Sequence, residues 1–266
     1  MLVLLVLVST VYGSGLAYAK PSNPTSCTPY TEHEKGILFD TDILVRGLPG
    51  PSFSDLRQAN FTLVGTYVKS GSVSEWNTIS TWINAAKASG FRTFVMAGPF
   101  PQPTLQKTLK VAIDSTKKAA SIGADVVELD EFLTCPSCSS ITKSQFLSIV
   151  QAGLSVNPSL KFIATDWSAQ ALNTLFSWTS EYACVRVTND NYNNKGMIDL
   201  DIQLSIQYGK TALTWLIFSK GGSDFDCYAN LNDWITYVKK SNMDTLFFWV
   251  DPTGTWQTQW STVATF

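Results

Sequence analysis

Glu128, Asp130 and Glu131 close one short apolar run, and their spacing suits acid/base chemistry. The run is Gly-Ala-Asp-Val-Val-Glu-Leu-Asp-Glu-Phe, residues 123–132. In a strand, Glu128 and Asp130 lie on one face and their apolar neighbours lie on the other. The apolar face is expected to pack against a layer of helices. Burying two carboxylates together is costly unless they are paired, hydrogen-bonded or protonated. The pair is therefore a candidate functional site, with a structural network of ion pairs as the alternative.

Further acidic and aromatic side chains stand where other β-like runs end. In the first run, Ile37 and Phe39 alternate with Asp40 and Asp42, so we expect both acids on the inner face. The remaining candidates are Tyr67, Glu131, Asp166, Trp167, Arg186, Asp190, Lys220, Trp249 and Asp251. If the strands form a parallel barrel, their carboxyl ends meet at one mouth, where active sites lie.

Carboxylates beside aromatic rings are suited to cleaving glycosidic bonds. One acid protonates the leaving oxygen, and a second carboxylate acts as nucleophile or activates water. We predict Asp130, Glu128 and Asp40 as catalytic residues and the other candidates as substrate-binding residues. Trp167 and Trp249 are expected to stack on sugar rings, although a place in the core is the alternative for any tryptophan.

The alternation of strand-like and helix-like segments along the chain predicts the elements that position these side chains. Strands are expected at 36–42, 61–68, 91–97, 125–131, 161–166, 182–188, 211–218 and 245–250. Helices are expected at 52–59, 74–89, 103–122, 142–156, 169–179, 197–207 and 226–240, with a short one after Thr253. Eight alternations without a break in composition predict an α/β fold, a single (β/α)8 TIM barrel. A doubly wound sheet is the alternative, but no glycine-rich phosphate turn follows the first strand.

Composition and the amino-terminal residues suggest an exported enzyme. The chain has 266 residues, 45% of them hydrophobic and 15% charged, with a net charge of −2. Without a basic run, a nucleic-acid partner is not expected. Residues 1–19 resemble a signal peptide cut after Ala19, with a membrane anchor as the alternative. We therefore predict a leader segment at 20–35, a catalytic barrel at 36–266, extracellular localisation, no stable membrane partner and a monomer.

The five cysteines are candidates for disulfides in an exported chain. Because five is odd, one is expected to stay free, and we predict Cys184, which lies in an apolar strand-like run. Cys135 and Cys138 are expected to bond to each other, or one of them to another loop cysteine. Zinc is the alternative for this Cys-x-x-Cys pair, but no second pair accompanies it.

A single histidine, His33, precedes the first strand. Histidine-based zinc hydrolases and Ser-His-Asp triads therefore lack their ligands or their base. A divalent cation held by Asp40, Asp42, Glu128 and Asp130 is an alternative, since hard cations take oxygen ligands. We expect neither a metal nor an organic cofactor.

The run Gly-Ala-Asp-Val-Val-Glu-Leu-Asp-Glu resembles the Gly-x-x-x-Asp-Glu strand end of secreted spherulin-like and endo-α-1,4-polygalactosaminidase-type glycoside hydrolase barrels. This resemblance implies that Asp130 is a catalytic acid with Glu131 beside it, and that a strand-one residue such as Asp40 belongs to the site. The chitinase-type strand fits less well, because Phe132 stands where its catalytic Glu would be. Retaining families with a Glu after strand seven also fit poorly, because Phe218-Ser219-Lys220 holds no acid.

These patterns favour a secreted, endo-acting glycoside hydrolase whose partner is a poly- or oligosaccharide. Two alternatives stay open. One is a carbohydrate-binding barrel without turnover. The other is a polysaccharide lyase in which Lys69, Arg186 and Lys220 neutralise a uronate.

Overall fold

The computed structural model describes residues 27–48, 50–97, 102–135, 138, 140–189, 194–217, 231–240, 243, 245–250 and 260–264. Its strands are β1 (Lys35–Phe39), β2 (Leu63–Tyr67), β3 (Arg92–Met96), β4 (Val126–Leu129), β5 (Lys161–Asp166), β6 (Val185–Asn189), β7 (Leu213–Ile217) and β8 (Thr245–Val250). Its helices are α1 (Thr41–Arg46), α2 (Phe53–Gln58), α3 (Val73–Ala88), α4 (Leu105–Ser121), α5 (Lys143–Val156), α6 (Ala169–Trp178), α7 (Lys195–Gln207), α8 (Leu231–Lys240) and α9 (Trp260–Ala264).

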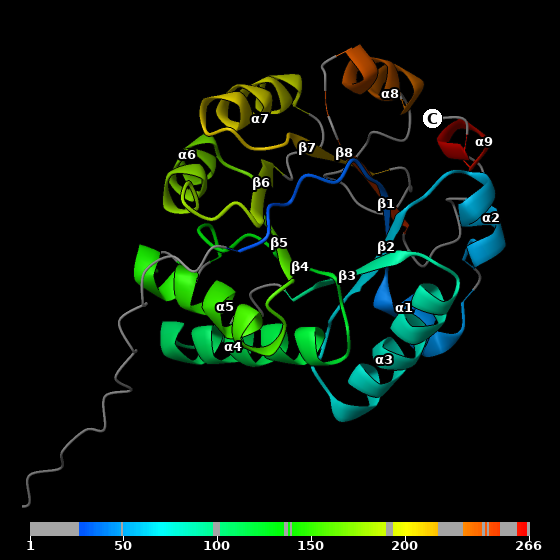
Figure 1. The fold of residues 1–266 in the computed structure, drawn as a ribbon, viewed down its shortest axis with the longest axis horizontal. Coiled ribbons are helices and arrows are strands. Elements are labelled where there is room, and N and C mark those ends of the chain that lie inside the picture. Colours follow the sequence, from blue (N-terminus) through cyan, green and yellow to red (C-terminus); the bar gives the residue numbers. More distant parts are fainter. Residues whose placement is uncertain are drawn as a thin grey trace, which may run out of the picture.

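The strands form one parallel sheet in the order β6-β5-β4-β3-β2-β1-β8-β7. Strand β1 pairs with both β2 and β8, so the first and last strands are neighbours. The sheet curls so that β6 and β7 meet at a seam, where Thr188 Oγ1 donates to the Leu213 carbonyl at 2.8 Å. Figure 1 shows the helices arranged around this curled sheet. The predicted (β/α)8 barrel is confirmed.

Strand one is shorter than predicted, because a helix begins where the strand was expected to continue. Asp40 is the N-cap of α1, and its Oδ1 accepts a hydrogen bond from Asp42 N at 2.8 Å. An N-cap aspartate satisfies a backbone N–H that has no partner within the helix. Gly47 ends the helix with a φ of 64°. The expected strand position of Asp42 is therefore wrong, since this residue lies in the first turn of α1.

The core has two layers, one inside the barrel and one between the strands and the helices. The inner layer comprises Tyr30, Leu38, Leu63, Phe94, Val126, Ile163 and Leu213. Val127 and Leu129 belong to the outer layer, packed among residues of α4 and α5. Strand β4 therefore alternates as predicted, with Glu128 on the inner face between the positions of Val126 and Asp130.

Glycine at position 65 lets an aromatic ring cross the interior. A Cβ added to Gly65 would lie 2.3 Å from Cδ1 of Phe94. Such a separation is far below van der Waals contact, so any side chain at 65 would displace the Phe94 ring. The inner layer of the barrel is thus filled by side chains and is not an open channel.

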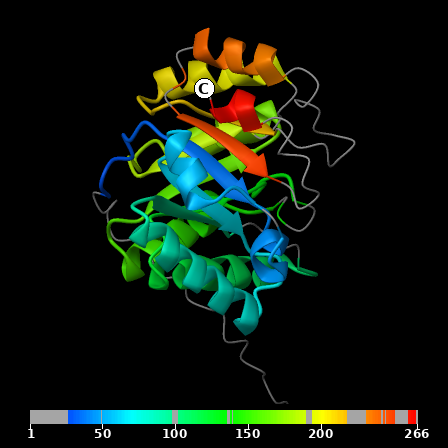
Figure 2. The same cartoon turned by 90° about the vertical axis from the view of Figure 1, so that its right-hand side faces the viewer.

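The amino-terminal strap, residues 27–34, closes the base of the barrel. Figure 2 places it at the tails of the strands, opposite the strand ends at which α1 begins. Lys161 Nζ donates to the carbonyls of Thr28 and Pro29, both at 2.6 Å. Arg186 donates through Nε to the Tyr30 carbonyl at 3.2 Å and through Nη2 to the Glu32 carbonyl at 2.5 Å. The second half of the predicted leader is therefore part of the fold.

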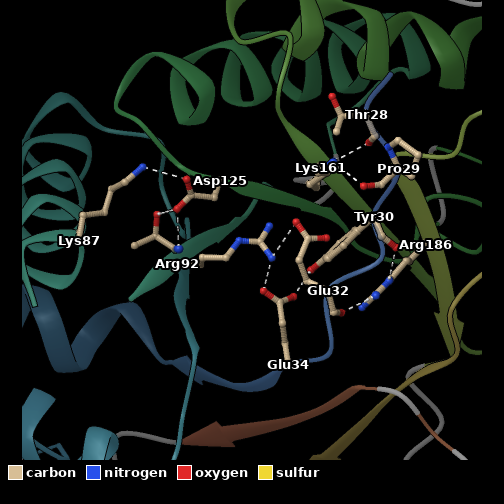
Figure 3. Close-up of polar contacts among 11 residues, drawn as sticks. Thr28, Pro29, Tyr30, Glu32, Glu34, Lys87, Arg92, Asp125, Lys161 and Arg186 are labelled. Atoms are coloured by element: carbon tan, nitrogen blue, oxygen red, sulfur yellow. Dashed lines mark hydrogen bonds and ion pairs between the residues drawn. The ribbon is translucent and has the colours of Figure 1, made fainter. Parts of the chain in front are cut away.

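Charged side chains surround Tyr30 at this base (Figure 3). The Tyr30 hydroxyl donates to Glu34 Oε2 at 2.7 Å, and the Arg186 guanidinium lies 4.0 Å from the ring centroid. Arg92 bonds to Glu34 and lies 3.4 Å from Glu32 Oε1. Burial raises the pKa of Glu34, although the charge of Arg92 opposes that rise. The cluster fixes the strap in place.

Among the described residues, two disulfides are present, Cys27–Cys184 and Cys135–Cys138. The predicted local bond is confirmed, and the two sulfurs bond to each other rather than to zinc. The prediction that Cys184 is free is wrong. The strap brings Cys27 next to Cys184, the residue immediately before β6. The remaining cysteine, Cys227, lies outside the described residues.

Within the part of the chain that the structure describes, no helix is both long and apolar enough to cross a bilayer. The predicted signal peptide, 1–19, lies outside that part.

Candidate active site

Asp130 lies directly after β4, on the inner face of the barrel. Its Oδ1 accepts a hydrogen bond from Thr165 Oγ1 at 2.8 Å. Burial raises the pKa of Asp130 to about 7; the Thr165 hydrogen bond opposes this, while the charges of Glu131 and Asp166 add to it. A carboxyl that holds its proton near neutral pH is suited to act as a general acid.

Glu131 has a backbone conformation that is rare for residues other than glycine. Its φ is 47°, in the left-handed region, where a residue with a Cβ carries a steric cost. Strained residues of this kind cluster at functional sites, where the surrounding structure holds them. Here the left-handed residue turns the chain immediately after Asp130, and the exposed side chain of Glu131 lies beside that acid.

Glu128 lies deeper in the barrel than Asp130. Its strand position is two residues earlier, about 6.6 Å along β4, in register with Met96 and Ile163. Only 1% of the residue is exposed. A polysaccharide reaching the mouth would meet Asp130 first, so of the two predicted catalytic acids on β4, Asp130 is the accessible one.

Asp40 gathers a second group of polar side chains at the end of β1. The Tyr67 hydroxyl donates to Asp40 Oδ2 at 2.6 Å, and Lys69 Nζ lies 2.9 Å from Asp40 Oδ1 and 2.7 Å from Asp42 Oδ2. Burial and the hydrogen bond to Asp40 raise the pKa of Tyr67, so its hydroxyl stays protonated. Burial acts to lower the pKa of Lys69, but its hydrogen bonds to Asp42 and Asp40 raise it overall. Asp40 is thus an ion-paired carboxylate that is only 4% exposed.

Glu75 of α3 fixes the loop that carries Lys69. Its carboxylate accepts from the backbone N–H groups of Lys69 at 2.6 Å, Ser70 at 2.9 Å and Gly71 at 2.7 Å. Glu75 is 6% exposed, so these bonds are largely shielded from water. One side chain thereby positions the ammonium group that contacts Asp40.

Asp166 is the last residue of β5, and its side chain does not face the barrel interior; Trp167 follows it. Phe162 and Ala164 of β5 belong to the outer core, and Asp166 continues that alternation. Its carboxylate accepts from Leu133 N and Trp167 N, both at 2.9 Å. Asp166, predicted as a substrate-binding residue, thus ties the loop after β4 to the end of β5. Trp167 is 50% exposed, as a sugar-stacking residue requires.

Arg186 was expected at the mouth and lies at the opposite end. It is the second residue of β6, is 1% exposed, and binds the strap. Its predicted role in substrate binding is incompatible with this position.

Three predicted residues lie outside the described part of the chain, and a fourth is described in its backbone alone. Asp190, Lys220 and Asp251 fall outside the described residues, and Trp249 lies in β8, paired in register with Leu38, with its side chain undescribed.

The alternative of a divalent cation finds no support at the described acids. No group of three or more His, Cys, Asp or Glu side chains suited to a metal occurs among the residues that the structure places. The Lys69 ammonium group lies between Asp40 and Asp42, where a cation would otherwise bind.

Sequence reasoning missed Thr165 and Glu75 as parts of the site. Thr165 lies opposite Asp130 because Leu129 pairs with Ala164, and this register cannot be read from one strand alone. Glu75 follows Ser72 by three residues, the spacing of a capping box, which was a readable signal.

No protein-family model matches this chain, and no curated protein sequence matches it. Several solved structures share its fold. A GH5 cellulase from an Icelandic hot spring isolate has a TM-score of 0.59 at 15% identity, covering 82% of this chain and 74% of that chain. The Ignisphaera aggregans GH53 catalytic domain has a TM-score of 0.53 at 13% identity, covering 85% and 88%. A xylose isomerase domain protein from Planctomyces limnophilus has a TM-score of 0.51 at 9% identity, covering 89% and 97%.

The chain thus has a TIM-barrel fold like that of glycoside hydrolases and of other TIM-barrel enzymes. At these identities the likeness concerns the fold alone, and function must be argued from the site.

Proposed function

We propose that this protein is a secreted glycoside hydrolase that cleaves bonds within a polysaccharide. The observation that carries the proposal is the contrast between two acids at one mouth. Asp130 is a partly exposed carboxyl whose pKa is raised to about 7, and Asp40 is a carboxylate paired with Lys69. Glycosidic hydrolysis requires one protonated and one ionised carboxyl group.

In this mechanism, Asp130 donates its proton to the leaving glycosidic oxygen. Thr165, which donates to Asp130 Oδ1, leaves Oδ2 as the position for that proton. Asp40 accepts a proton from the attacking water or attacks the anomeric carbon itself. Tyr67 and Lys69 fix its orientation. The half-exposed Trp167 provides an apolar face on which a sugar ring can stack.

The geometry weakens the lyase alternative. A lyase acting on a uronate needs cationic groups that are available to the substrate carboxylate. Arg186 is buried at the base, and Lys69 already contacts Asp40 and Asp42. A binding barrel without turnover would have no need for an acid with a raised pKa beside a second carboxylate, so hydrolysis is the function we favour.

The strand end formed by Asp130 and Glu131 also supports the finer proposal that this enzyme resembles endo-α-1,4-polygalactosaminidase-type hydrolases. The matching positions are Gly123, Asp130 and Glu131. Secretion is supported by the signal-like residues 1–19 and by the two disulfides.

A polysaccharide screen tests the proposal. Purified wild-type protein is incubated with galactosaminogalactan, β-glucan, mannan and galactan, and new reducing ends are measured. Wild-type protein should release them from at least one polymer, and Asp130→Asn should lose roughly 10²–10⁴-fold in rate. Absence of reducing ends from every polymer, or an undiminished rate in the variant, would contradict the proposal.

A further inference from the structure

A cavity of about 310 Å³ lies beside the mouth, outside the barrel interior. Its walls are the loop after β4 and one face of α6. Gln170, Thr174 and Trp178 lie four residues apart, so they share that face of α6. The other lining residues are Leu133, Thr134, Cys138, Ile141, Ser168 and Ala171. We call this cavity the α6 pocket. Its volume lies at the lower end of the range for small-molecule sites, about 300–1,000 Å³.

The lining of the α6 pocket suits an uncharged, hydroxyl-rich ligand. No charged side chain is among its lining residues, which combine hydroxyl and amide groups with apolar surface. Thr174 Oγ1 donates to the Gln170 carbonyl at 2.8 Å, so its oxygen retains acceptor capacity. The exposed Gln170 amide makes no hydrogen bond to another residue that the structure describes. Trp178, which packs against Phe146 at 6.0 Å between ring centroids, provides a fixed aromatic wall.

The α6 pocket is connected to the candidate active site by short links. Leu133, in the pocket wall, follows Asp130 by three residues and donates its N–H to Asp166 Oδ2. Ser168, also in the wall, directly follows the half-exposed Trp167. The Cys135–Cys138 disulfide stiffens the loop after β4, which forms one wall of the pocket. A chain that leaves the mouth across Trp167 therefore meets the pocket next.

We propose that the α6 pocket binds a neutral sugar unit of the same polysaccharide that reaches the mouth, as a second binding site beside Trp167. The ligand class rests on the proposed function, but the occupancy of the pocket does not require turnover. The pocket holds one sugar ring against Trp178 while Gln170 and Thr174 bind its hydroxyl groups. A polymer is thereby held at two points.

The test measures binding separately from hydrolysis. All proteins carry Asp130→Asn, and their binding to soluble galactosaminogalactan, β-glucan, mannan and galactan is measured by affinity electrophoresis and calorimetry. Thr174→Phe fills the pocket, and Asn173→Phe adds the same ring to an exposed neighbouring position of α6 that does not line it. Thr174→Phe should weaken binding by roughly tenfold, the effect of losing one or two polar contacts, and Asn173→Phe should not.

Hydrogen exchange locates the bound sugar. Binding should slow exchange at residues 133–135 and 168–178, in addition to the strand ends. The inference would be overturned if binding left hydrogen exchange at these segments unchanged and Thr174→Phe did not weaken the affinity. This holds even if wild-type protein hydrolyses the polymer. Slowed exchange there without release of reducing ends would support the pocket and contradict the proposed hydrolysis. Failure to bind any of the four polymers would overturn the inference.

Discussion

Two aspartates at one mouth differ in their surroundings, and this difference assigns their roles. Burial raises the pKa of Asp130 to about 7, and the charges of Glu131 and Asp166 add to that rise. Asp40 instead has an ammonium group and a phenol hydroxyl as partners. The same residue type can thus serve as acid and as base because the neighbouring charges differ.

The raised pKa of Asp130 predicts that both the rate and the stability of the protein fall as the pH rises. Since activity requires the protonated form, the rate should fall as the pH rises through about 7. The folded state favours protonated Asp130, so this group stabilises the protein fully at low pH, and the contribution is lost as the pH rises from near 4 to about 7. Relative to wild type, Asp130→Asn should therefore gain stability over that interval while losing activity. Denaturant unfolding at pH 4 and pH 8 measures the first effect.

Asp201 provides the matched control. It is fully buried in α7, its pKa is also raised by burial to about 7, and its Oδ2 accepts from Asn189 N at 3.0 Å. Relative to wild type, Asp201→Asn should also gain stability as the pH rises from near 4 to about 7. Its dependence of rate on pH should stay like that of wild type. If Asp201→Asn shifted the rate profile as strongly as Asp130→Asn, the assignment of the acid to Asp130 would be wrong.

At the scale of elements, the loop between β2 and α3 depends on one buried carboxylate. Glu75 accepts three backbone N–H groups of residues 69–71. We predict that Glu75→Ala lowers the free energy of unfolding by roughly 2–4 kcal/mol, because each bond to a charged group contributes about 1.5–3 kcal/mol and water replaces part of the loss. Activity should also fall, because Lys69 would be displaced from Asp40. Glu75→Gln, which keeps one acceptor oxygen, should retain more of both; equal losses in the two variants would exclude this positioning role.

The two disulfides should differ in their effect on stability. Cys27 and Cys184 are 157 residues apart, and Cys135 and Cys138 are 3 apart. In the chain-entropy model, closing the long loop contributes roughly 5 kcal/mol and closing the short loop roughly 2 kcal/mol. Replacing the first pair by serine should therefore lower the unfolding midpoint more than replacing the second. Thermal unfolding of both double variants checks this, and a larger loss from the short loop would contradict it.

The elements were largely predictable, while the contacts between distant elements were not. The boundaries of β5 and β8 match the prediction, because apolar runs bounded by polar residues define strands locally. Helix α1 was missed because its first residues, Thr41 and Asp42, were assigned to the end of the first strand. Asp130 and Asp40 were identified from alternation, but Arg186 was placed at the wrong end because its position relative to the strap depends on the folded chain. Cys184 was misassigned for the same reason.

At the scale of the whole molecule, the positions of β1 and β4 predict the stereochemical outcome. Two strands, β2 and β3, separate them in the sheet. Three steps of about 4.8 Å around a tilted eight-stranded barrel place the two strand ends on opposite walls, roughly 14 Å apart. Two aspartate side chains reaching inward reduce this gap to the wider carboxylate separation of inverting enzymes, about 6.5–9.5 Å. We therefore predict inversion. Proton NMR of the first-formed product would show the opposite anomer to the substrate, and a retained anomer would contradict Asp40 as the partner of Asp130.

The strap also determines the order in which the molecule can be completed. It is made first, yet Lys161 and Arg186, which bind its carbonyls, are 133 and 156 residues from their partners. At a synthesis rate of about 5–20 residues per second, about 7–30 seconds separate the synthesis of the two ends of these contacts. Contacts so distant in sequence close late, since the intervening chain must first lose its freedom. The strap therefore cannot make all of these contacts until β6 has been synthesised. Until then, the base of the incomplete sheet is open to chaperones and proteases.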